Sequence, residues 1–256
     1  MESNSVLLFA ADLGQALLEN GGETARIEKT INKVCGNLGM ERSDAFVLPT
    51  GIMLSITDSM GKTYSLVRRI DKREINLEMI SQLGRFAGSI TGSESMEALK
   101  ERFEEIMVSP VYSLWVSLLF GGAAAFCFTL LFGGGMREGF IAFVVGFLVK
   151  LLVSYLEGVK FNRYFNNVIG GFVISLLALA SLRLSLSQDP GVIISGAIML
   201  LVPGLIMVNS IRDFIAGDLV SGATRLVESL IIGGAIAVGT GVGLALWVRL
   251  YGEVVL

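Results

Sequence analysis

The polar residues between positions 201 and 229 have the types and the spacing that chemistry requires. Aspartates, which can titrate or bind a cation, alternate there with arginines, whose planar guanidinium groups bind carboxylates through two parallel hydrogen bonds. Asn209 and Asp213 are four residues apart, as are Ser221 and Arg225, so each pair would share a helical face. We therefore predict a binding site for a small polar solute in this segment. Its candidate residues are Asn209, Ser210, Arg212, Asp213, Asp218, Ser221, Arg225 and Glu228.

Two helix-breaking residues, Pro203 and Gly204, precede this cluster and belong to the predicted site. Proline lacks an amide N–H and clashes with the preceding turn, and glycine lowers helix stability, so we expect a kink or a break. A broken helix frees backbone polar groups beside the polar side chains. The alternative is an ordinary loop whose charges are solvated. Apolar residues interleaved with the polar ones favour a packed segment; they are Ile211, Phe214, Ile215, Leu219 and Val220.

The elements that must position this cluster are predominantly apolar. The chain is 53% hydrophobic and 17% charged, and most of the charges precede Pro110. A helix needs about 20 apolar residues to cross a bilayer. We predict an α-helical polytopic membrane protein, with an N-terminal cytoplasmic α+β domain over residues 1–110 and a transmembrane domain of about five helices over residues 111–256. The predicted spans are Ser113–Phe132, Gly139–Leu156, Val168–Ser187, Gly191–Val208 and Leu226–Val248.

One charged residue and several glycines lie within these spans. An unpaired charge at the position of Lys150 would cost about 3 kcal/mol or more. Lys150 is therefore either a member of the site, with Glu157 two helical turns away, or a residue whose ammonium group extends to the membrane interface. Gly239 and Gly243 predict close helix packing, and we expect their partner to be another subunit or another copy of this chain.

The first 110 residues combine helical and strand patterns. The expected elements are helices over residues 5–19, 23–38, 76–91 and 94–108 and strands within residues 45–57 and 63–70. A second polar group lies near the start of the second helix and either stabilises that helix or serves catalysis. Its members are Glu19, Glu23, Thr24, Arg26 and Glu28.

The composition argues against several classes of function. The chain has no histidine, which is the commonest general base and zinc ligand, and it contains no catalytic or nucleotide-binding motif. We therefore expect no enzyme, no cofactor and no metal. A net charge of −3 gives no electrostatic basis for a nucleic-acid partner.

Basic residues near the predicted span ends indicate an orientation. Lysine and arginine are enriched in cytoplasmic loops, and here they are more numerous on the side that carries the N-terminal domain. We expect a multi-pass protein of the plasma membrane, with its N-terminus in the cytoplasm and its C-terminus outside.

Three stretches together resemble the threonine/serine exporter family, in particular the larger, YjjP-type subunit of its split, two-component branch. They occur in the family's order, and the resemblance covers nearly the whole chain. The stretches are LLENGGETARIEKTINKVCGNLGM (Leu17–Met40) with the Pro-Thr-Gly that follows, GGAAAFCFTLLFGG (Gly121–Gly134) and LVPGLIMVNSIRDFIAGDLVSGATRLVES (Leu201–Ser229).

This resemblance implies one subunit of a secondary exporter of small metabolites, either amino acids such as threonine and serine or dicarboxylates such as succinate. It also implies a small companion membrane protein with four or five spans, and hence a homo- or hetero-oligomer. The alternative is a membrane-anchored hydrolase whose N-terminal domain carries the chemistry, because the family's soluble domain is likened to a hydrolase. A tether, however, needs one or two spans and not five.

Overall fold

The computed structural model describes residues 2–108, 112–159 and 162–252. The predicted domain boundary at Pro110 lies outside these residues. The chain divides into two compact units. The first contains Met1–Val111 together with Leu205–Leu226, and the second contains Tyr112–Gly204 together with Val227–Leu256.

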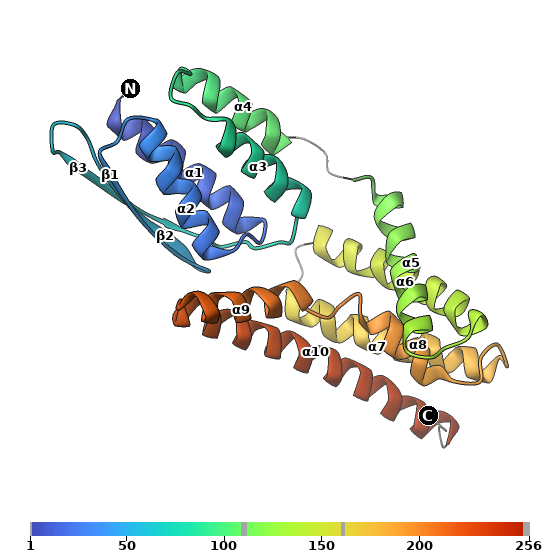
Figure 1. Cartoon of the computed structure of the whole chain (residues 1–256). Helices are drawn as coiled ribbons and strands as arrows, with labels where there is room; N and C mark the ends of the chain where they lie inside the picture. Colours follow the sequence, from blue (N-terminus) through green and yellow to red (C-terminus); the bar gives the residue numbers. More distant parts are fainter. Residues whose placement is uncertain (1, 109–111, 160–161, 253–256) are drawn as a thin grey trace. The chain divides into compact units, whose positions relative to one another are not determined.

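In the first unit, two layers of helices cover one face of a three-stranded antiparallel sheet (Figure 1). Helices α1 and α2 pack on the sheet, and α3 and α4 pack on α1. The elements are α1 (Ser3–Glu19), α2 (Thr24–Asn37), β1 (Arg42–Leu48), β2 (Gly51–Thr57), β3 (Thr63–Arg69), α3 (Leu77–Ser89) and α4 (Met96–Val108). All the elements that we predicted for the first 110 residues are present.

The alternation of side chains along β2 explains why the helices lie on one face. Ile52, Leu54 and Ile56 are at most 1% exposed, whereas Met53 is half exposed on the other face. Successive side chains of a strand point to opposite faces, so the three isoleucine and leucine side chains meet the helices. The core of the unit forms between the sheet and the helices.

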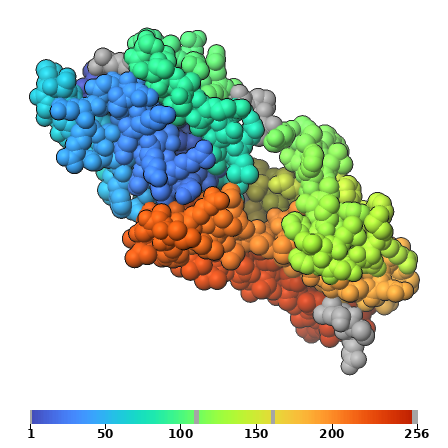
Figure 2. All heavy atoms as spheres, in the orientation of Figure 1, coloured from blue at the N-terminus to red at the C-terminus, as the bar shows by residue number. Residues whose placement is uncertain are grey.

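The first unit also contains a helical hairpin from the far end of the sequence. It consists of α9 (Gly204–Ala216) and the first two turns of α10 (Leu219–Tyr251), joined at Gly217. Figure 2 shows the orange atoms of this hairpin directly against the blue atoms of the N-terminal helices. This unit therefore combines residues from before and after position 110.

The second unit is entirely helical in the residues described. It is formed by α5 (Leu114–Leu131), α6 (Met136–Gly158), α7 (Arg163–Arg183), α8 (Pro190–Ile198) and the remainder of α10. In the described part of the chain, four helices are long and apolar enough to cross a membrane, namely α5, α6, α7 and α10. This is the architecture of a membrane protein.

The predicted span Gly191–Val208 is not a continuous helix, and this confirms the break that we expected at Pro203 and Gly204. Helix α8 ends at Ile198, and α9 begins only at Gly204. The residue before a proline is disfavoured in the helical conformation, so the chain leaves the helix before Pro203. Nine residues of α8 extend about 14 Å, roughly half the thickness of a bilayer core.

Helices α7 and α10 run parallel to each other. Near their starts, Arg163 of α7 forms an ion pair of 3.6 Å with Glu228 of α10. At their other ends, the guanidinium carbon of Arg183 lies 4.5 Å from the centre of the Tyr251 ring. The segment between the two helices must consequently return toward the start of α7, and a Cβ at Gly170 would lie 2.8 Å from Leu201.

Close helix packing at the predicted glycines occurs within the chain itself. A Cβ at Gly239 would collide with the Val168 carbonyl oxygen of α7, and one at Gly243 would collide with Ser175. Similarly, a Cβ at Gly121 of α5 would lie 3.2 Å from the side chain of Lys150 on α6. The expectation that Gly239 and Gly243 pack against another subunit or copy is therefore wrong.

Candidate functional site

The hairpin of α9 and α10 has well-defined local causes. Gly217 adopts a φ of +88°, a conformation that other residues rarely adopt, and so terminates α9. Asp218 then caps α10, because its Oδ1 accepts the amide N–H of Ser221 at 3.1 Å. The Ser210 hydroxyl donates to the Gly222 carbonyl at 2.7 Å, which links the two helices. The polar side chains between positions 209 and 225 are thus held on a rigid support.

The turn between α1 and α2 supplies the other half of the site. Gly21 has a φ of +91°, and the Gly22 amide donates to the Leu17 carbonyl at 2.9 Å. The carbonyl groups of these two glycines point to the hairpin. Asn209 Nδ2 donates to the Gly21 oxygen at 3.3 Å, and Arg225 Nη2 donates to the Gly22 oxygen at 2.9 Å.

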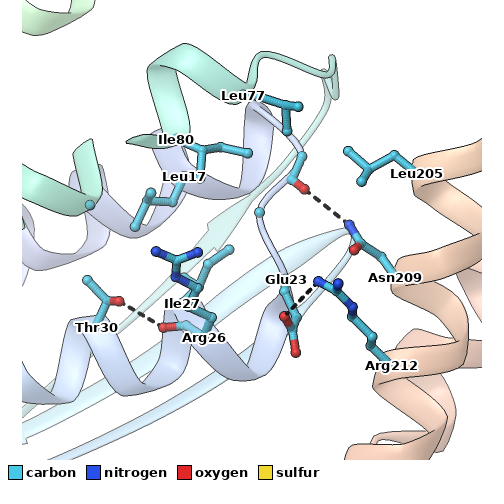
Figure 3. Close-up of a pocket in the computed structure, with 13 residues that line it drawn as sticks. Leu17, Glu23, Arg26, Ile27, Thr30, Leu77, Ile80, Leu205, Asn209 and Arg212 are labelled. Carbon is cyan, nitrogen blue, oxygen red and sulfur yellow. Dashed lines mark hydrogen bonds and ion pairs between the residues drawn. The ribbon is translucent and has the colours of Figure 1, made fainter. Parts of the chain in front are cut away.

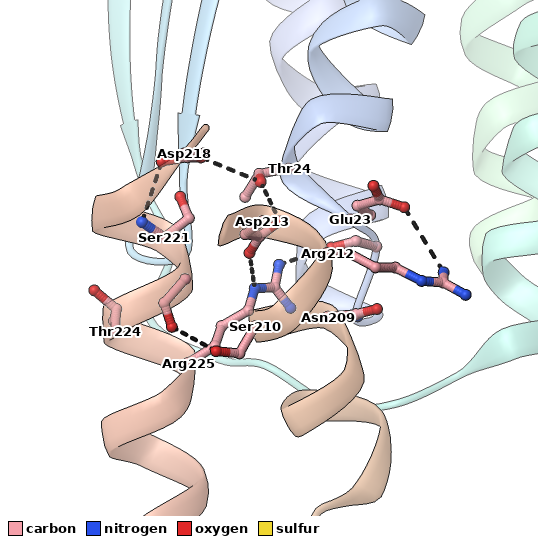
Figure 4. Close-up of polar contacts among 12 residues, drawn as sticks. Glu23, Thr24, Asn209, Ser210, Arg212, Asp213, Asp218, Ser221, Thr224 and Arg225 are labelled. Carbon is pink, nitrogen blue, oxygen red and sulfur yellow. Dashed lines mark hydrogen bonds and ion pairs between the residues drawn. The ribbon is translucent and has the colours of Figure 1, made fainter. Parts of the chain in front are cut away.

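Asp213 lies at the centre of the contact (Figure 4). Its side chain is completely buried, its Oδ1 accepts the Thr24 hydroxyl at 2.9 Å, and its Oδ2 lies 3.0 Å from Nε of Arg225. Thr24 is itself completely buried, and Arg225 is only 6% exposed. Removing one partner of a buried ion pair costs about 3–5 kcal/mol, because it leaves an uncompensated charge. The ion pair of this triad thus holds α9 and α10 together, and the Thr24 hydroxyl and the Gly22 carbonyl join this buried pair to the N-terminal helices.

Further carboxylates surround the triad. The Thr24 hydroxyl also lies 3.3 Å from Oδ2 of Asp218. Burial raises the pKa of Asp213, as do the charges of Asp218 and Glu23, whereas the Thr24 hydrogen bond and the Arg225 charge lower it. Burial likewise raises the pKa of Glu28. The site concentrates acidic groups, and the Asp213 carboxyl binds a proton more readily than an ordinary aspartate.

A cavity of about 170 Å³ opens beside this cluster, between α1, α2, α3 and α9 (Figure 3). Arg212, whose side chain is 59% exposed, stands at its rim and lies 3.8 Å from Oε2 of Glu23. Apolar side chains form one wall. The lining residues are Leu17, Gly21, Gly22, Glu23, Arg26, Ile27, Thr30, Leu77, Ile80, Gly84, Leu205, Asn209 and Arg212.

The structure brings most of the predicted site residues to one place. Asn209, Arg212, Asp213, Asp218 and Arg225 all contact the region from Gly21 to Thr24, while Ser210 and Ser221 stabilise the hairpin. The burial of Asp213 and Arg225 contradicts the alternative of a solvated loop.

The other predicted residues lie elsewhere. Pro203 and Gly204 mark the break before α9, and Glu228 pairs with Arg163. Lys150 is half buried on α6 and packs at Gly121, and the described residues contain no ion pair between it and Glu157. Neither Lys150 nor Glu228 takes part in the cluster around Asp213.

Thr24 and the carbonyl groups of Gly21 and Gly22 were not among the predicted site residues. Thr24 was assigned to a separate polar group, and 189 residues separate it from Asp213. The sequence feature that indicates them is the glycine pair followed by Glu23 and Thr24, because a turn of this kind presents carbonyl groups and a hydroxyl group together.

Comparison with known proteins agrees with a membrane transport protein. The family model described as "Putative threonine/serine exporter" matches residues 8–247. This chain belongs to the threonine/serine exporter family. No solved structure matches it significantly.

The similar proteins are of two kinds, one about twice as long as this chain and one of nearly the same length. The threonine/serine exporter of Corynebacterium glutamicum is 29% identical over 253 residues, which cover 94% of this chain but 51% of that protein. The protein named "Probable succinate transporter subunit YjjP" of Klebsiella aerogenes is 23% identical, over 96% of this chain and 95% of its own length. Its Escherichia coli counterpart is 22% identical over 96% of both chains. The chain thus spans about half of the first relative and nearly all of the other two.

Proposed function

We propose that the chain is one subunit of a secondary exporter of small metabolites that carry a carboxylate, and that it acts with a small membrane partner. Membership of the exporter family supports export as such. The observation that carries the proposal is the buried triad of Thr24, Asp213 and Arg225, which connects the N-terminal domain to the helix that follows the break at Pro203.

We further propose five membrane crossings, one of which is not a continuous helix. Because α7 and α10 are parallel, the chain between them must cross the membrane in the opposite direction. This crossing would consist of α8, the break at residues 199–203 and the start of α9. Discontinuous helices are common at transporter substrate sites. An odd number of crossings leaves the N-terminus in the cytoplasm and the C-terminus outside, as the basic residues predict.

The cluster around Asp213 would be the regulated end of this broken crossing. Asp213 would alternate between a proton and Arg225, because burial raises its pKa and so favours the neutral form more than at an exposed aspartate. Because the pKa is raised in the assembled site, protonation would favour that site, and loss of the proton would loosen the hairpin from α2. The chain has no histidine, so carboxyl groups are the side chains best suited to couple transport to protons.

The names of the relatives and an exposed arginine support the proposed substrate class. Relatives are named for threonine and serine or for succinate, all of which carry a carboxylate. We predicted both Arg212 and Arg225 as counter-charges. Arg225 is occupied by Asp213 and the Gly22 carbonyl, so Arg212, which is mostly exposed, is the better candidate.

Flux into proteoliposomes tests the proposal. The chain would be reconstituted with its membrane companion, and uptake of labelled threonine and of labelled succinate would be measured under an imposed proton gradient. We expect flux of one substrate class, and a reduction of about tenfold or more for Asp213→Asn at equal protein level. Asp44→Asn, on the exposed sheet, is the matched control. Wild-type flux in Asp213→Asn would exclude the proposed coupling.

A membrane-anchored hydrolase is the second reading. Thr24 is the hydroxyl group nearest to acidic residues in the site, but its complete burial leaves no path for a substrate. Turnover of model esters or peptides by the purified chain, abolished by Thr24→Val, would favour this reading over transport.

A further inference from the structure

We propose that the cavity beside α2 binds a carboxylate of the transported metabolite, with Arg26 as the principal anchor. The cavity lies wholly within the first unit and is lined by two arginines, Arg26 and Arg212, and by a single carboxylate, Glu23. The inference rests on the proposed function for the choice of metabolite, but the binding site itself stands on the geometry of the cavity.

The charges in the cavity are unbalanced toward the positive side. The described residues place no ion pair on Arg26, and its side chain extends to within 3.7 Å of a Cβ built at Gly84 (Figure 3). Glu23 is already engaged by Arg212, at 3.8 Å. A guanidinium group with five N–H donors in a planar fork and no counter-ion is suited to a carboxylate.

The remaining walls fit the rest of a small metabolite. Leu17, Ile27 and Ile80 would contact a short aliphatic body, and the Thr30 hydroxyl and the Asn209 amide offer polar contacts. A cavity of about 150 Å³ accommodates benzene, so the present volume of about 170 Å³ suits a four-carbon compound. A threonine would place its ammonium group near Glu23, whereas succinate would place its second carboxylate near Arg212.

The position of the cavity gives such binding a consequence for transport. Asn209 lines the cavity and also donates to the Gly21 carbonyl, and Arg212 lies one residue before Asp213 on α9. A ligand held between Arg26 and Arg212 would therefore bridge α2 and α9 at the same contact that the triad maintains. The cavity would act as a substrate-sensing site next to the proposed switch.

Binding to the purified full chain in detergent tests the inference without any flux assay. L-Threonine and succinate would be titrated separately by calorimetry, with inorganic phosphate as the competing anion. We expect one of the two metabolites to bind, and Arg26→Gln to weaken its binding about tenfold or more, since a hydrogen bond to a charged group contributes at this level. Arg42→Gln, an exposed arginine paired with Asp44, should bind like the wild type.

A second pair of variants separates filling of the cavity from loss of charge. Gly84→Leu would extend a side chain toward Arg26 and should abolish binding, whereas Gly88→Leu, one turn further along α3, meets no atom within 4 Å at its Cβ position and should not. Wild-type affinity in both Arg26→Gln and Gly84→Leu would overturn the inference, and so would a wild type that binds neither metabolite. Equal binding of inorganic phosphate would show a general anion site and would also overturn it.

The two proposals fail differently. If the chain binds the metabolite, loses this binding in Arg26→Gln and yet shows no flux with any companion, the result would support the binding site in the cavity and contradict the exporter proposal. Flux without any binding in the cavity would support the exporter proposal and contradict the proposed binding site.

Discussion

At the scale of single residues, the Thr24 hydroxyl forms a hydrogen bond of 2.9 Å that links the two halves of the candidate site. It donates to Asp213, which is completely buried as Thr24 itself is, and it lies near Asp218, which is partly buried. A buried carboxylate that loses a hydrogen-bond donor retains the full cost of its desolvation. The stability of the first unit should therefore depend on this one hydroxyl.

We predict that Thr24→Val lowers the unfolding free energy by about 1–3 kcal/mol, since valine preserves the shape and removes only the donor. The change would be measured as a decrease in Tm of the full chain in detergent. Thr57→Val is the matched control, because Thr57 bonds to Thr63 on the exposed face of the sheet. Equal Tm values for the two variants would mean that the contact between Thr24 and Asp213 contributes nothing.

The raised pKa of Asp213 predicts a pH dependence of stability. The folded state holds the proton of Asp213 above pH 3.8, where an ordinary aspartate has begun to lose it. The folded state therefore binds more protons than the unfolded state in this window, and the stabilisation falls as pH rises through the folded pKa. Asp213→Asn should abolish this part of the dependence.

This prediction can be checked by measuring Tm between about pH 4 and pH 8 for the wild type and for Asp213→Asn. The wild type should lose stability relative to the variant as the pH rises, because only the wild type carries a carboxyl group that must ionise at this buried position. Two parallel curves would show that Asp213 does not titrate differently in the folded state.

At the scale of elements, the parallel pair of α7 and α10 depends on glycine. Gly239 faces the Val168 carbonyl group so closely that any side chain would displace one helix, whereas Gly241 has no atom within 4 Å of its Cβ position. Overpacking of a tight contact costs about 1–3 kcal/mol. The same substitution should thus lower stability at Gly239 and leave it nearly unchanged at Gly241.

We predict that Gly239→Val lowers the Tm of the full chain in detergent by several degrees, while Gly241→Val leaves it near the wild-type value. Valine has the same intrinsic effect on helix formation at both positions, so the difference isolates the contact with α7. If Gly241→Val is the more harmful variant, the glycine flank faces another molecule and not α7.

At the scale of the whole molecule, the number of crossings decides on which side each terminus lies. Four continuous helices alone would return the chain to its starting side, and the proposed broken crossing through α8 would change this result. A companion that begins outside would cross the membrane in the opposite sense. Transporters built from such inverted parts hold their substrate near the midplane, between the two parts.

Cysteine labelling checks this topology in a variant in which Cys35 and Cys127, the two native cysteines, are replaced by serine. We predict that Ser3→Cys reacts with an impermeant maleimide only after permeabilisation, and that Glu253→Cys, which lies outside the described residues, reacts in intact cells. Labelling of both positions from one side would leave only an even number of crossings.

The sequence by itself determined which parts of the chain fold into which elements. The elements α1 to α7 and all three strands were predictable, because the features that define them depend only on residues close in the sequence. These features are apolar runs of about 20 residues, the asparagine and glycines after Glu19, and the alternation along residues 51–57. The break at Pro203 was predictable for the same reason, because proline disrupts its own turn. The polar residues from Asn209 to Arg225 were also visible as a group.

Only the tertiary structure decided what these residues contact. Thr24 and Asp213 are 189 residues apart, and no local pattern indicates that a turn of the N-terminal domain forms hydrogen bonds to the buried ion pair of a late helical hairpin. The partner of Gly239 was likewise not predictable, because a glycine permits close packing against a helix of the same chain or of another chain. Partners of this kind are chosen by long-range packing and by the need to satisfy buried charges, and both depend on the assembled fold.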